Sequence, residues 1–522
     1  MLRILFPLVL VILSLDDCLS SVGPVADLVI SNVNVSPDGF SRSAISVGGM
    51  FPGPVISGKK GDRFRLNVHD QLTDNTMART TSIHWHGIFQ QTTNWADGAA
   101  FVSQCPIAPN NSFLYEFNVE QSGTYWYHSH LSTQYCDGLR GAIVIYDPDD
   151  PHGALYDVDD ESTVITLADW YHLPSPAATP TLTRPFPYSN ATLINGKGRY
   201  EGGPAVPLSV VNIESGKRYR FRIVSMACDP NFTFSIDNHQ FTVIEADGEG
   251  VVPLLVDSLV ISPGQRYSVV LNANQPVDNY WIRADPSRGI PGFAGGINSA
   301  VLRYSGAPAS EPLTVQLPSI MPLLETALVP STSPAAPGIP AQGQADVVIN
   351  IAHDFDFDSF HYRMNGYPWI PPKVPVLLQI LSGARTAQEL LPKGSLYSLP
   401  RNKVIELSLP GTGPELGGPH PFHLHGHSFS VVRSAGSKIY NYATPVRRDT
   451  VSTGVDGDNV TIRFVTDNAG PWFLHCHIDW HLELGLAVVF AEDIPDTPAL
   501  DPVPAAWEQL CPIYDQLPSD EQ

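Results

Sequence analysis

Histidines are concentrated in four short segments of this 522-residue chain, two near its start and two near its end. The segments read His84-Trp85-His86, His128-Ser129-His130, His420-Pro421-Phe422-His423-Leu424-His425 and His475-Cys476-His477, and His481 follows the last of them. Alternate side chains of an extended strand share one face, so each His-x-His pair presents two imidazoles to the same side. Ten clustered histidines and one cysteine at these spacings predict strands that bind metal ions.

The glycines around these segments repeat, which indicates two copies of one domain. Each copy has a glycine directly after its first His-x-His pair, another five residues before its second pair, and a third eight residues after that pair. These glycines are Gly87, Gly123 and Gly138 in the first copy, and Gly426, Gly470 and Gly485 in the second. The first copy has Thr81, Ser129 and Gln134 where the second has His420, Cys476 and His481. Only the last copy therefore carries a Cys-His-His set.

The middle of the chain resembles both copies but lacks the ligands. Its segment Tyr280-Trp281-Ile282-Arg283 matches Tyr125-Trp126-Tyr127-His128 with arginine in place of histidine. We therefore expect three related domains, of which the outer two bind metal. The expected ranges are residues 21–150, 151–310 and 345–522, with a connection rich in Pro, Ala and Ser at 311–344.

Alternating apolar and polar residues predict an all-β fold. Residues 64–68, 219–223 and 460–464 alternate with a period of two, as half-buried strands do. The 41 glycines and 48 prolines separate short strands in the manner of sandwiches and barrels. Helical patterns are short, for example at residues 386–391 and 505–510.

The first twenty residues are typical of a signal peptide. Arg3 precedes an apolar run at residues 4–13, and Cys18-Leu19-Ser20 is suited to cleavage. We expect a secreted protein whose mature chain starts at Ser21. The formal net charge of the full sequence, −22, argues against nucleic acid or an anionic membrane surface as a partner.

Four cysteines remain outside the signal peptide and the histidine segments, and an even number in a secreted chain predicts two disulfides. They are Cys105, Cys136, Cys228 and Cys511, and their spacing leaves all three pairings open. Sequons for N-glycosylation occur at Asn34, Asn110, Asn190, Asn231 and Asn459.

The ligand set indicates copper at two kinds of site. If the two copies face each other, their eight His-x-His imidazoles converge and suit three ions with positions open for dioxygen. Cys476 points to the opposite face of its strand, where it can meet His420 and His481. One thiolate with two imidazoles is typical of a blue-copper site. Leu486, ten residues after Cys476, offers no donor where a weak axial ligand often stands, which favours a raised reduction potential.

The chain resembles the blue multicopper oxidases and, within them, the fungal laccases. The motifs that carry the resemblance are Gly23-Pro24-Val25-Ala26-Asp27-Leu28, Asn94-Trp95-Ala96-Asp97-Gly98 and His475-Cys476-His477-Ile478-Asp479-Trp480-His481. It implies three consecutive cupredoxin-like Greek-key β-sandwich or barrel domains, bound copper, and a monomer. It also implies one-electron oxidation of phenols and aromatic amines, coupled to reduction of dioxygen to water.

The resemblance also implies a role for each ligand. The mononuclear type 1 copper would take His420, Cys476 and His481, and the type 2 copper would take His84 and His423. One type 3 copper would take His86, His128 and His477. The other would take His130, His425 and His475. The implied disulfides are Cys105–Cys511 and Cys136–Cys228.

Further residues receive roles from the resemblance alone. Asp229 would be the carboxylate of the substrate pocket and accept the proton of a phenol, while His481 would receive the electron. Asp97 and Asp479 resemble acidic residues near the oxygen site, and Phe186 and Phe293 would form pocket walls. Each of the three acidic residues also has a structural interpretation. Asp97-Gly98 is a turn signal, and Asp229-Pro230 is an ordinary loop dipeptide. Asp479 is suited to orient a neighbouring ligand.

Two other functions compete with the laccase hypothesis. One is a multicopper oxidase with another reductant, namely a ferroxidase, ascorbate oxidase or bilirubin oxidase; the six methionines disfavour a cuprous oxidase. The other is a copper-binding protein without activity. Lignin degradation and pigment synthesis would use the same site.

Histidines outside the repeat are expected to be ordinary polar residues. His427 continues the alternation of His423 and His425, but Phe89 stands at the matching position of the first copy. We therefore expect His427 to support a ligand or the fold. We expect satisfied polar side chains at His69, His152, His172, His239, His353 and His361.

Overall fold

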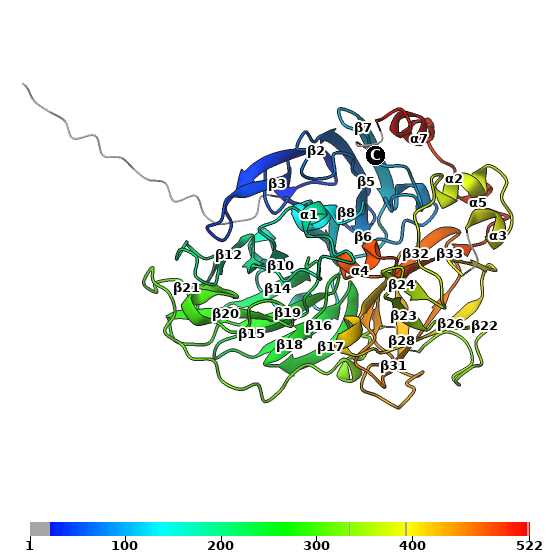
Figure 1. The fold of residues 1–522 in the computed structure, drawn as a ribbon. Coiled ribbons are helices and arrows are strands. Elements are labelled where there is room, and N and C mark those ends of the chain that lie inside the picture. Colours follow the sequence, from blue (N-terminus) through cyan, green and yellow to red (C-terminus); the bar gives the residue numbers. More distant parts are fainter. Residues whose placement is uncertain (1–20, 333–334, 392–393, 519–520, 522) are drawn as a thin grey trace, which may run out of the picture.

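The computed structural model describes residues 21–332, 335–391, 394–518 and 521, so the expected signal peptide lies outside the described residues. About 40% of the chain is strand and 11% is helix, which confirms the all-β prediction. The sheets fall into three sets along the chain, and no described sheet takes strands from two sets. Figure 1 shows the first set in blue and cyan, the second in green, and the third in yellow to red.

The first set has two sheets. The five-stranded sheet runs β1 (Ser21–Val22), β4 (Val55–Lys59), β9 (Arg140–Tyr146), β8 (Gly123–Ser129) and β6 (Ile83–His86). The four-stranded sheet runs β3 (Arg42–Val47), β2 (Val25–Val35), β5 (Arg63–Gln71) and β7 (Ser112–Asn118). In β5 the exposed and buried positions alternate, as the period of two predicts.

The second set is larger. Its seven-stranded sheet runs β12 (Lys197–Tyr200), β11 (Ala191–Ile194), β10 (Val164–Trp170), β14 (Arg218–Ser225), β19 (Arg266–Asn272), β16 (Phe241–Ala246) and β17 (Glu249–Val256). Its five-stranded sheet runs β13 (Val210–Ile213), β21 (Ser299–Tyr304), β20 (Asn279–Pro286), β15 (Phe232–Ile236) and β18 (Ser258–Ile261).

The third set contains two five-stranded sheets and a hairpin. One sheet runs β22 (Val347–Asn350), β26 (Val404–Pro410), β31 (Asn459–Val465), β28 (Phe429–Arg433) and β29 (Arg447–Arg448). The other runs β25 (Leu396–Leu399), β33 (Ala487–Glu492), β32 (Gly470–Cys476), β27 (Pro421–Leu424) and β30 (Thr450–Ser452). The hairpin pairs β23 (His353–Asp356) with β24 (His361–Met364).

Described helices are short and lie at the ends of strands or in the tail. They are α1 (Ser175–Ala178), α2 (Val376–Leu381), α3 (Ala387–Leu390), α4 (Asp479–Glu483), α5 (Thr497–Leu500), α6 (Ala505–Glu508) and α7 (Leu510–Tyr514). A capping box formed by Thr386 and Glu389 starts α3 within the expected helical segment. Among the described residues, no helix is long and apolar enough to cross a membrane.

The repeat in the sequence appears as matching strand registers. In the first set β6 pairs with β8, and His84 lies opposite His128. In the third set β27 pairs with β32, and His423 lies opposite His475. Equivalent histidines of the two copies thus occupy equivalent positions on equivalent strands.

Two strands differ from the half-buried pattern that we expected. Arg220 and Arg222 of β14 are buried, because Arg220 pairs with Glu245 at 2.5 Å and Arg222 pairs with Asp159 at 2.7 Å. In β31 the whole segment 460–464 is buried, and Arg463 pairs with Glu406 at 2.6 Å. Charged side chains that look solvent-facing in the sequence are therefore neutralised inside the protein.

Two disulfides join distant parts of the chain, and they are the pairs that the resemblance implies. Cys105–Cys511 ties the tail to the first set of sheets, where Figure 1 shows α7 beside β7. Cys136–Cys228 ties the first set to the second.

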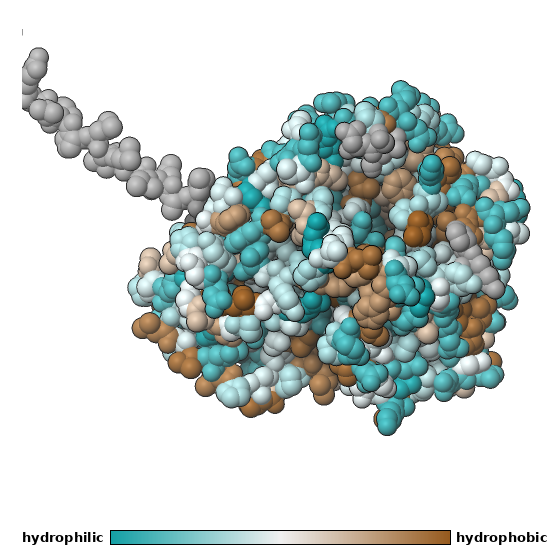
Figure 2. Space-filling view, in the orientation of Figure 1, coloured by the Kyte–Doolittle hydropathy of each residue, from teal (hydrophilic) through white to brown (hydrophobic). Residues whose placement is uncertain are grey.

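The surface is mixed in polarity. On the face shown in Figure 2, hydrophilic side chains are interspersed with small apolar groups. Asn34, Asn110 and Asn190 are exposed, whereas Asn231 and Asn459 are half-buried. The first three sequons are therefore the more accessible to a glycan.

Candidate metal centres and their pocket

Eight buried imidazoles from the first and third sets converge in one place, which we call the histidine cluster. They are His84, His86, His128, His130, His423, His425, His475 and His477. The two copies meet directly, since the ring centroids of His86 and His423 are 3.7 Å apart and those of His84 and His425 are 3.9 Å apart. The convergence expected from the repeat is thus present in the structure.

Most rings of the cluster are oriented by a hydrogen bond on one nitrogen. Four rings donate from Nδ1 to a backbone carbonyl oxygen at 2.8–2.9 Å. The pairs are His84 to Asp97, His128 to Ser129, His423 to Asp449 and His475 to Cys476. His425 Nδ1 donates to Asp97 Oδ2 at 2.9 Å. Metal-binding histidines are commonly held in this way, which leaves the second nitrogen available as a ligand.

The second nitrogens fit a metal. Nε2 of His84, His128 and His423 is buried without a hydrogen-bond partner, and a buried polar atom without a partner is uncommon. Nε2 of His425 lies 3.1 Å from Nε2 of His475. Burial, reinforced by neighbouring imidazoles, lowers the pKa of His425 and His475 well below the usual value. Neutral rings with inward lone pairs are the form that binds copper.

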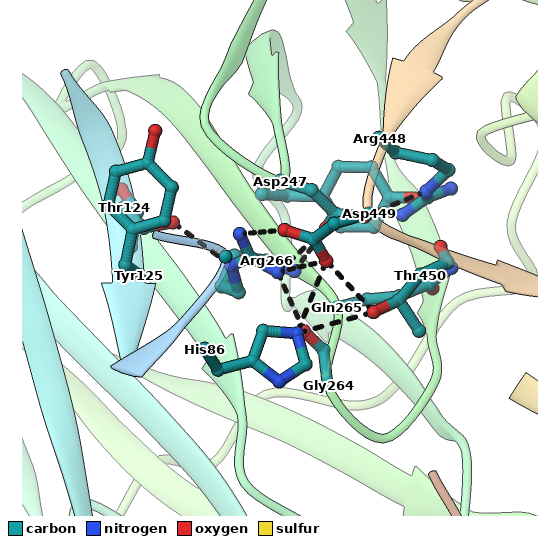
Figure 3. A network of polar contacts seen from close by, with 12 residues as sticks. His86, Thr124, Tyr125, Asp247, Gly264, Gln265, Arg266, Arg448, Asp449 and Thr450 are labelled. Carbon is teal, nitrogen blue, oxygen red and sulfur yellow. Dashed lines mark hydrogen bonds and ion pairs between the residues drawn. The ribbon is translucent and has the colours of Figure 1, made fainter. Parts of the chain in front are cut away.

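A buried polar network on one side of the cluster, shown in Figure 3, was not predicted from the sequence. His86 Nε2 donates to Asp449 Oδ1 at 3.2 Å. Arg266, from β19 of the second set, donates to both carboxylate oxygens of Asp449, at 2.8 and 2.6 Å. Although burial opposes its charge, Arg266 and the nearby imidazoles hold the pKa of Asp449 well below its usual value. A domain that contributes none of the eight imidazoles thus helps to orient one of them, His86.

The network also includes Asp247 of the second set and Arg448 of the third. Asp247 accepts hydrogen bonds from the Arg266 backbone N–H at 2.8 Å and from Arg448 Nε at 2.9 Å. Beside it, a Cβ added to Gly264 would lie 2.9 Å from His477 Cδ2 and 3.0 Å from His86 Cε1. The only trace in the sequence is the charged run Arg447-Arg448-Asp449 between apolar strands. The middle domain therefore packs backbone and a guanidinium against the cluster.

A second group of ligands, which we call the Cys476 site, lies on the other side of β32. His420 Nδ1 and His481 Nδ1 are 3.5 and 3.6 Å from Cys476 Sγ, and 3.1 Å from each other. All three residues are buried. One sulfur and two imidazole nitrogens converge here, which is the donor set of a blue-copper ion. Leu486 lies beside them, since its carbonyl accepts the Cys476 N–H at 3.0 Å and its buried side chain offers no donor.

A cavity of about 860 Å³, which we call the His481 pocket, opens beside the Cys476 site. His481, Asp229 and Phe186 line it, and the rings of Phe186 and His481 are 5.6 Å apart. A Cβ at Gly417 would lie 2.8 Å from His481 Nε2, so glycine keeps this edge of the ring open. The pocket therefore ends against the buried ring of His481.

Asp229 is the buried carboxylate of this pocket. Its Oδ2 lies 3.5 Å from Arg288 Nε, and its Oδ1 has no hydrogen-bond partner. Burial raises the pKa of Asp229 to about 6, while Arg288 opposes this shift. A carboxylate with one oxygen unpaired and a pKa in this range is suited to accept a proton above about pH 6, where it is ionised.

Phe293 does not lie in the His481 pocket, and our prediction that it forms a wall is not reproduced. It lines a separate hollow with Arg199 and Arg283, and its ring stacks with the Arg283 guanidinium at 4.6 Å. Arg283 stands where the outer copies have a histidine ligand. Phe293 therefore packs against a residue that replaces a metal ligand.

The two acidic residues assigned to the oxygen site differ. Asp97 bonds the rings of both His84 and His425, and Gly98 after it has a φ of +82°, so the residue pair serves both a turn and the cluster. Asp479 is buried, its N–H donates to the Cys228 carbonyl at 2.8 Å, and burial with Glu483 raises its pKa well above the usual value. No hydrogen bond links Asp479 to a cluster imidazole in the described residues.

His427 points away from the cluster. Its Nδ1 donates to the His425 carbonyl at 3.1 Å, and its Nε2 lies 3.1 Å from Glu492 Oε1. It therefore supports the segment that carries His425.

The other lone histidines divide into two groups. Those with a polar partner on the ring are His69, His172, His239 and His361. His152 lacks a partner only at Nε2, whereas both ring nitrogens of His353 are buried without a partner, so the prediction of a satisfied side chain is wrong for His353. His353 packs edge-on against the ring of His420, with the two ring centroids 5.0 Å apart.

Comparisons with known proteins agree with this geometry. Three models of the multicopper oxidase family match residues 29–150, 161–307 and 369–496. The solved structure of Fet3p, a multicopper oxidase that functions in iron import, has a TM-score of 0.83 at 28% identity and covers 95% of both chains. That of a laccase from Botrytis aclada has a TM-score of 0.81 at 30% identity, covering 95% of this chain and 93% of the other.

The chain belongs to the multicopper oxidases. Laccase-2 of Pleurotus ostreatus is 59% identical over 100% of this chain and 98% of its own length, and Laccase-2 of Trametes villosa is 61% identical over 97% and 96%. Within the family the chain is thus a laccase of the fungal type, with copper as its cofactor and small molecules and dioxygen as its substrates.

Proposed function

We propose that this laccase oxidises phenols and aromatic amines one electron at a time beside His481, and reduces dioxygen to water at the histidine cluster. Copper, when bound, supplies the one-electron chemistry at both places. The observation that carries the proposal is the position of Cys476. Its side chain belongs to the site beside the pocket, and its neighbours His475 and His477 belong to the cluster.

The ligand sets divide between the two places. His420, Cys476 and His481 would hold one copper ion. His84 and His423 would hold the type 2 ion of the cluster, and the type 3 ions would be held by His86, His128 and His477 and by His130, His425 and His475. Support comes from the mutual proximity of the last three side chains, whose ligand atoms all lie within 4.8 Å of one another.

Asp229 would accept the substrate's proton. A phenol that loses an electron becomes strongly acidic, so a nearby base lowers the barrier. Asp229 Oδ1 has no protein partner, and Asp229 shares the pocket with His481 and the apolar ring of Phe186. These three side chains would align the substrate.

Peptide backbone would carry the electron from the pocket side to the cluster. Cys476 is joined covalently to His475 and His477, and the His475 Nδ1–H also donates to the Cys476 carbonyl at 2.9 Å. This connection is rigid because β32 pairs along its length with β33. No moving part is needed between the two sites.

Two carboxylates would serve the proton-consuming reduction of dioxygen. Asp97 holds the rings of His84 and His425 and is fully buried. Asp479 lies in α4, between His477 and His481 in sequence, with Glu483 near it. We assign Asp97 to positioning and Asp479 to proton supply.

The protein would act as a secreted, glycosylated monomer without nucleic-acid or membrane partners. The support is the apolar leader at residues 4–13, the exposed sequons and the net charge of −22.

A metal-ion reductant is the second candidate, because the Fet3p structure is so similar. The His481 pocket disfavours it. Arg184 and Arg288 balance the two acidic residues of its lining, so the pocket offers no excess negative charge to attract a ferrous ion, and aromatic rings such as Phe186 line much of the rest. Organic reductants fit this pocket better.

Substitution of Cys476 by serine tests the proposed function. We expect Cys476→Ser to lose the intense blue absorption and the oxidation of phenols together, while the cluster keeps its copper. Absorption spectroscopy, copper analysis and oxygen uptake with a methoxyphenol measure this. Full activity in a colourless variant would contradict the proposal.

A further inference from the structure

The His481 pocket contains positive charge in a strongly acidic protein. The chain has 52 acidic and 30 basic residues, yet Arg184 and Arg288 both line this cavity, together with Asp229 and Glu415. The net charge of −22 repels anionic molecules at a distance. Any affinity for an anionic substrate must therefore be created locally.

Arg288 follows β20 and reaches the base of the pocket. Its Nε lies 3.5 Å from Asp229 Oδ2, and its guanidinium stands 5.2 Å above the ring of Tyr188. The side chain is 28% exposed. Within the described residues, its terminal nitrogens donate no hydrogen bond to the protein. A guanidinium has five N–H donors, so most of its donor capacity is available to a ligand.

We propose that Arg288 determines substrate specificity by binding an anionic group on the aromatic ring that Asp229 and His481 receive. This inference rests on the proposed function and names a substrate class within it, namely phenols that carry a carboxylate. A planar guanidinium matches a carboxylate with two parallel hydrogen bonds.

The short distance between Arg288 and Asp229 restricts where the anionic group stands. The terminal nitrogens of a guanidinium lie about 2 Å beyond Nε, so they remain within a few ångströms of the carboxylate that takes the phenol proton. A carboxylate ortho or meta to the hydroxyl reaches Arg288 while the hydroxyl meets Asp229. A para carboxylate lies at the far side of the ring and does not.

Arg288 also fits the chemistry of its neighbour. It opposes the effect of burial on the Asp229 carboxyl and thereby favours the proton-accepting form. A substrate carboxylate bound to Arg288 keeps the charge in the pocket balanced. Phe186 and Leu416 supply the apolar walls against which the ring packs.

Matched substrates test the inference. The probes are 3-hydroxy-4-methoxybenzoate, its para isomer 4-hydroxy-3-methoxybenzoate, and the methyl ester of each, assayed above the pKa of the carboxyl groups. For each isomer the measured quantity is kcat/KM of the acid divided by kcat/KM of its ester. Comparing each ratio between a variant and the unsubstituted protein cancels the oxidation potentials of the probes, which no substitution changes.

We expect Arg288→Gln to lower the ratio of the meta isomer about tenfold, mainly through KM, and to change that of the para isomer little. Arg288→Lys keeps the positive charge but loses the two parallel N–H donors. Its ratio for the meta isomer should therefore lie between those of the unsubstituted protein and Arg288→Gln. Arg303→Gln is the control for net charge, because Arg303 lies on β21 outside the pocket and bonds Asn279. It should leave both ratios unchanged.

The inference would be overturned if Arg288→Gln left the acid-to-ester ratio of the meta isomer unchanged, or lowered the ratio of the para isomer by the same factor. An equal fall in Arg303→Gln would overturn it too, since the effect would then belong to the net charge. Failure of the unsubstituted protein to oxidise either neutral ester would instead count against the proposed function.

Discussion

At the histidine cluster most outward ring nitrogens donate to protein oxygens, whereas at the Cys476 site Nε2 of His481 has no partner in the described part of the chain. All three domains contact the cluster, and the middle one contributes Arg266 although none of the eight imidazoles comes from it. The Cys476 site instead adjoins a cavity.

This difference follows from what each site contacts. The cluster admits only a small ligand, so rigid orientation of every imidazole serves it. His481 instead borders a pocket through a buried ring, and its Nε2 has no hydrogen-bond partner in the described residues. We therefore expect substitutions around the two sites to separate copper binding from substrate oxidation.

The largest expected effect is at Asp449. Asp449→Asn removes the closer of the two carboxylates that neutralise the buried Arg266 and leaves it only Asp247, at 3.7 Å, so we expect a cost near the lower end of about 3–5 kcal/mol of folding free energy. The ring of His86 also loses its anionic acceptor. Denaturant unfolding should show the loss of stability, and copper analysis should show loss from the cluster while the blue absorption stays.

Glu406→Gln is the matched control. It breaks the buried Arg463–Glu406 pair in the third set of sheets, away from the ligands. It should destabilise the fold without removing cluster copper. If both variants keep all their copper, Asp449 is only a structural ion-pair partner.

At the pocket, Asp229→Asn should lower kcat/KM for phenols about 10²-fold and leave a donor that releases no proton nearly unaffected. The pKa of Asp229 is raised to about 6, and only its ionised form accepts a proton. The kcat/KM of the unsubstituted protein for phenols should therefore increase as the pH rises through about 6. This increase should be absent from the pH profile of the variant. Equal losses with both donors would show that Asp229 is not the base.

Gly264 offers a test of close packing by the middle domain. Gly264→Ala places a methyl group 2.9 Å from His477 and 3.0 Å from His86, at a φ of +83°. We expect a loss of about 2 kcal/mol and weaker cluster copper. Gly61→Ala shares the positive φ, at +88°, but has nothing within 4 Å of the added Cβ. Similar copper loss in both variants would assign the effect to backbone strain alone.

The smallest effect should come from Leu486. Leu486→Met is nearly volume-conserving, so the fold should change little. A thioether beside Cys476 stabilises the oxidised copper and should lower the reduction potential of this site only. Redox titration of the blue absorption measures it. An unchanged potential would mean that the methionine sulfur does not reach the metal.

The convergence of the histidines was predictable because strand geometry fixes the direction of each side chain locally. His-x-His pairs face one side with a period of two, and the glycine spacing of the two copies shows that His84 corresponds to His423. Cys476, between two ligands of one face, had to point to the other. None of these inferences required knowledge of distant contacts.

Residues that support the ligands were missed because they come from segments with no repeat. Asp449 and Arg266 are 183 positions apart in sequence, and only the packing of three domains joins them. Phe293 and Arg283 show the same limit, since an aromatic residue in a loop gives no sign of which cavity it will line. Buried arginines such as Arg463 look solvent-facing until their partners are known.

Copper analysis of the purified protein, together with its visible absorption spectrum, tests the central claim most directly. Two separate sites predict about four copper ions per chain and an intense blue colour from the cysteine–copper bond. A colourless protein with two or fewer copper ions, even after reconstitution, would contradict the account.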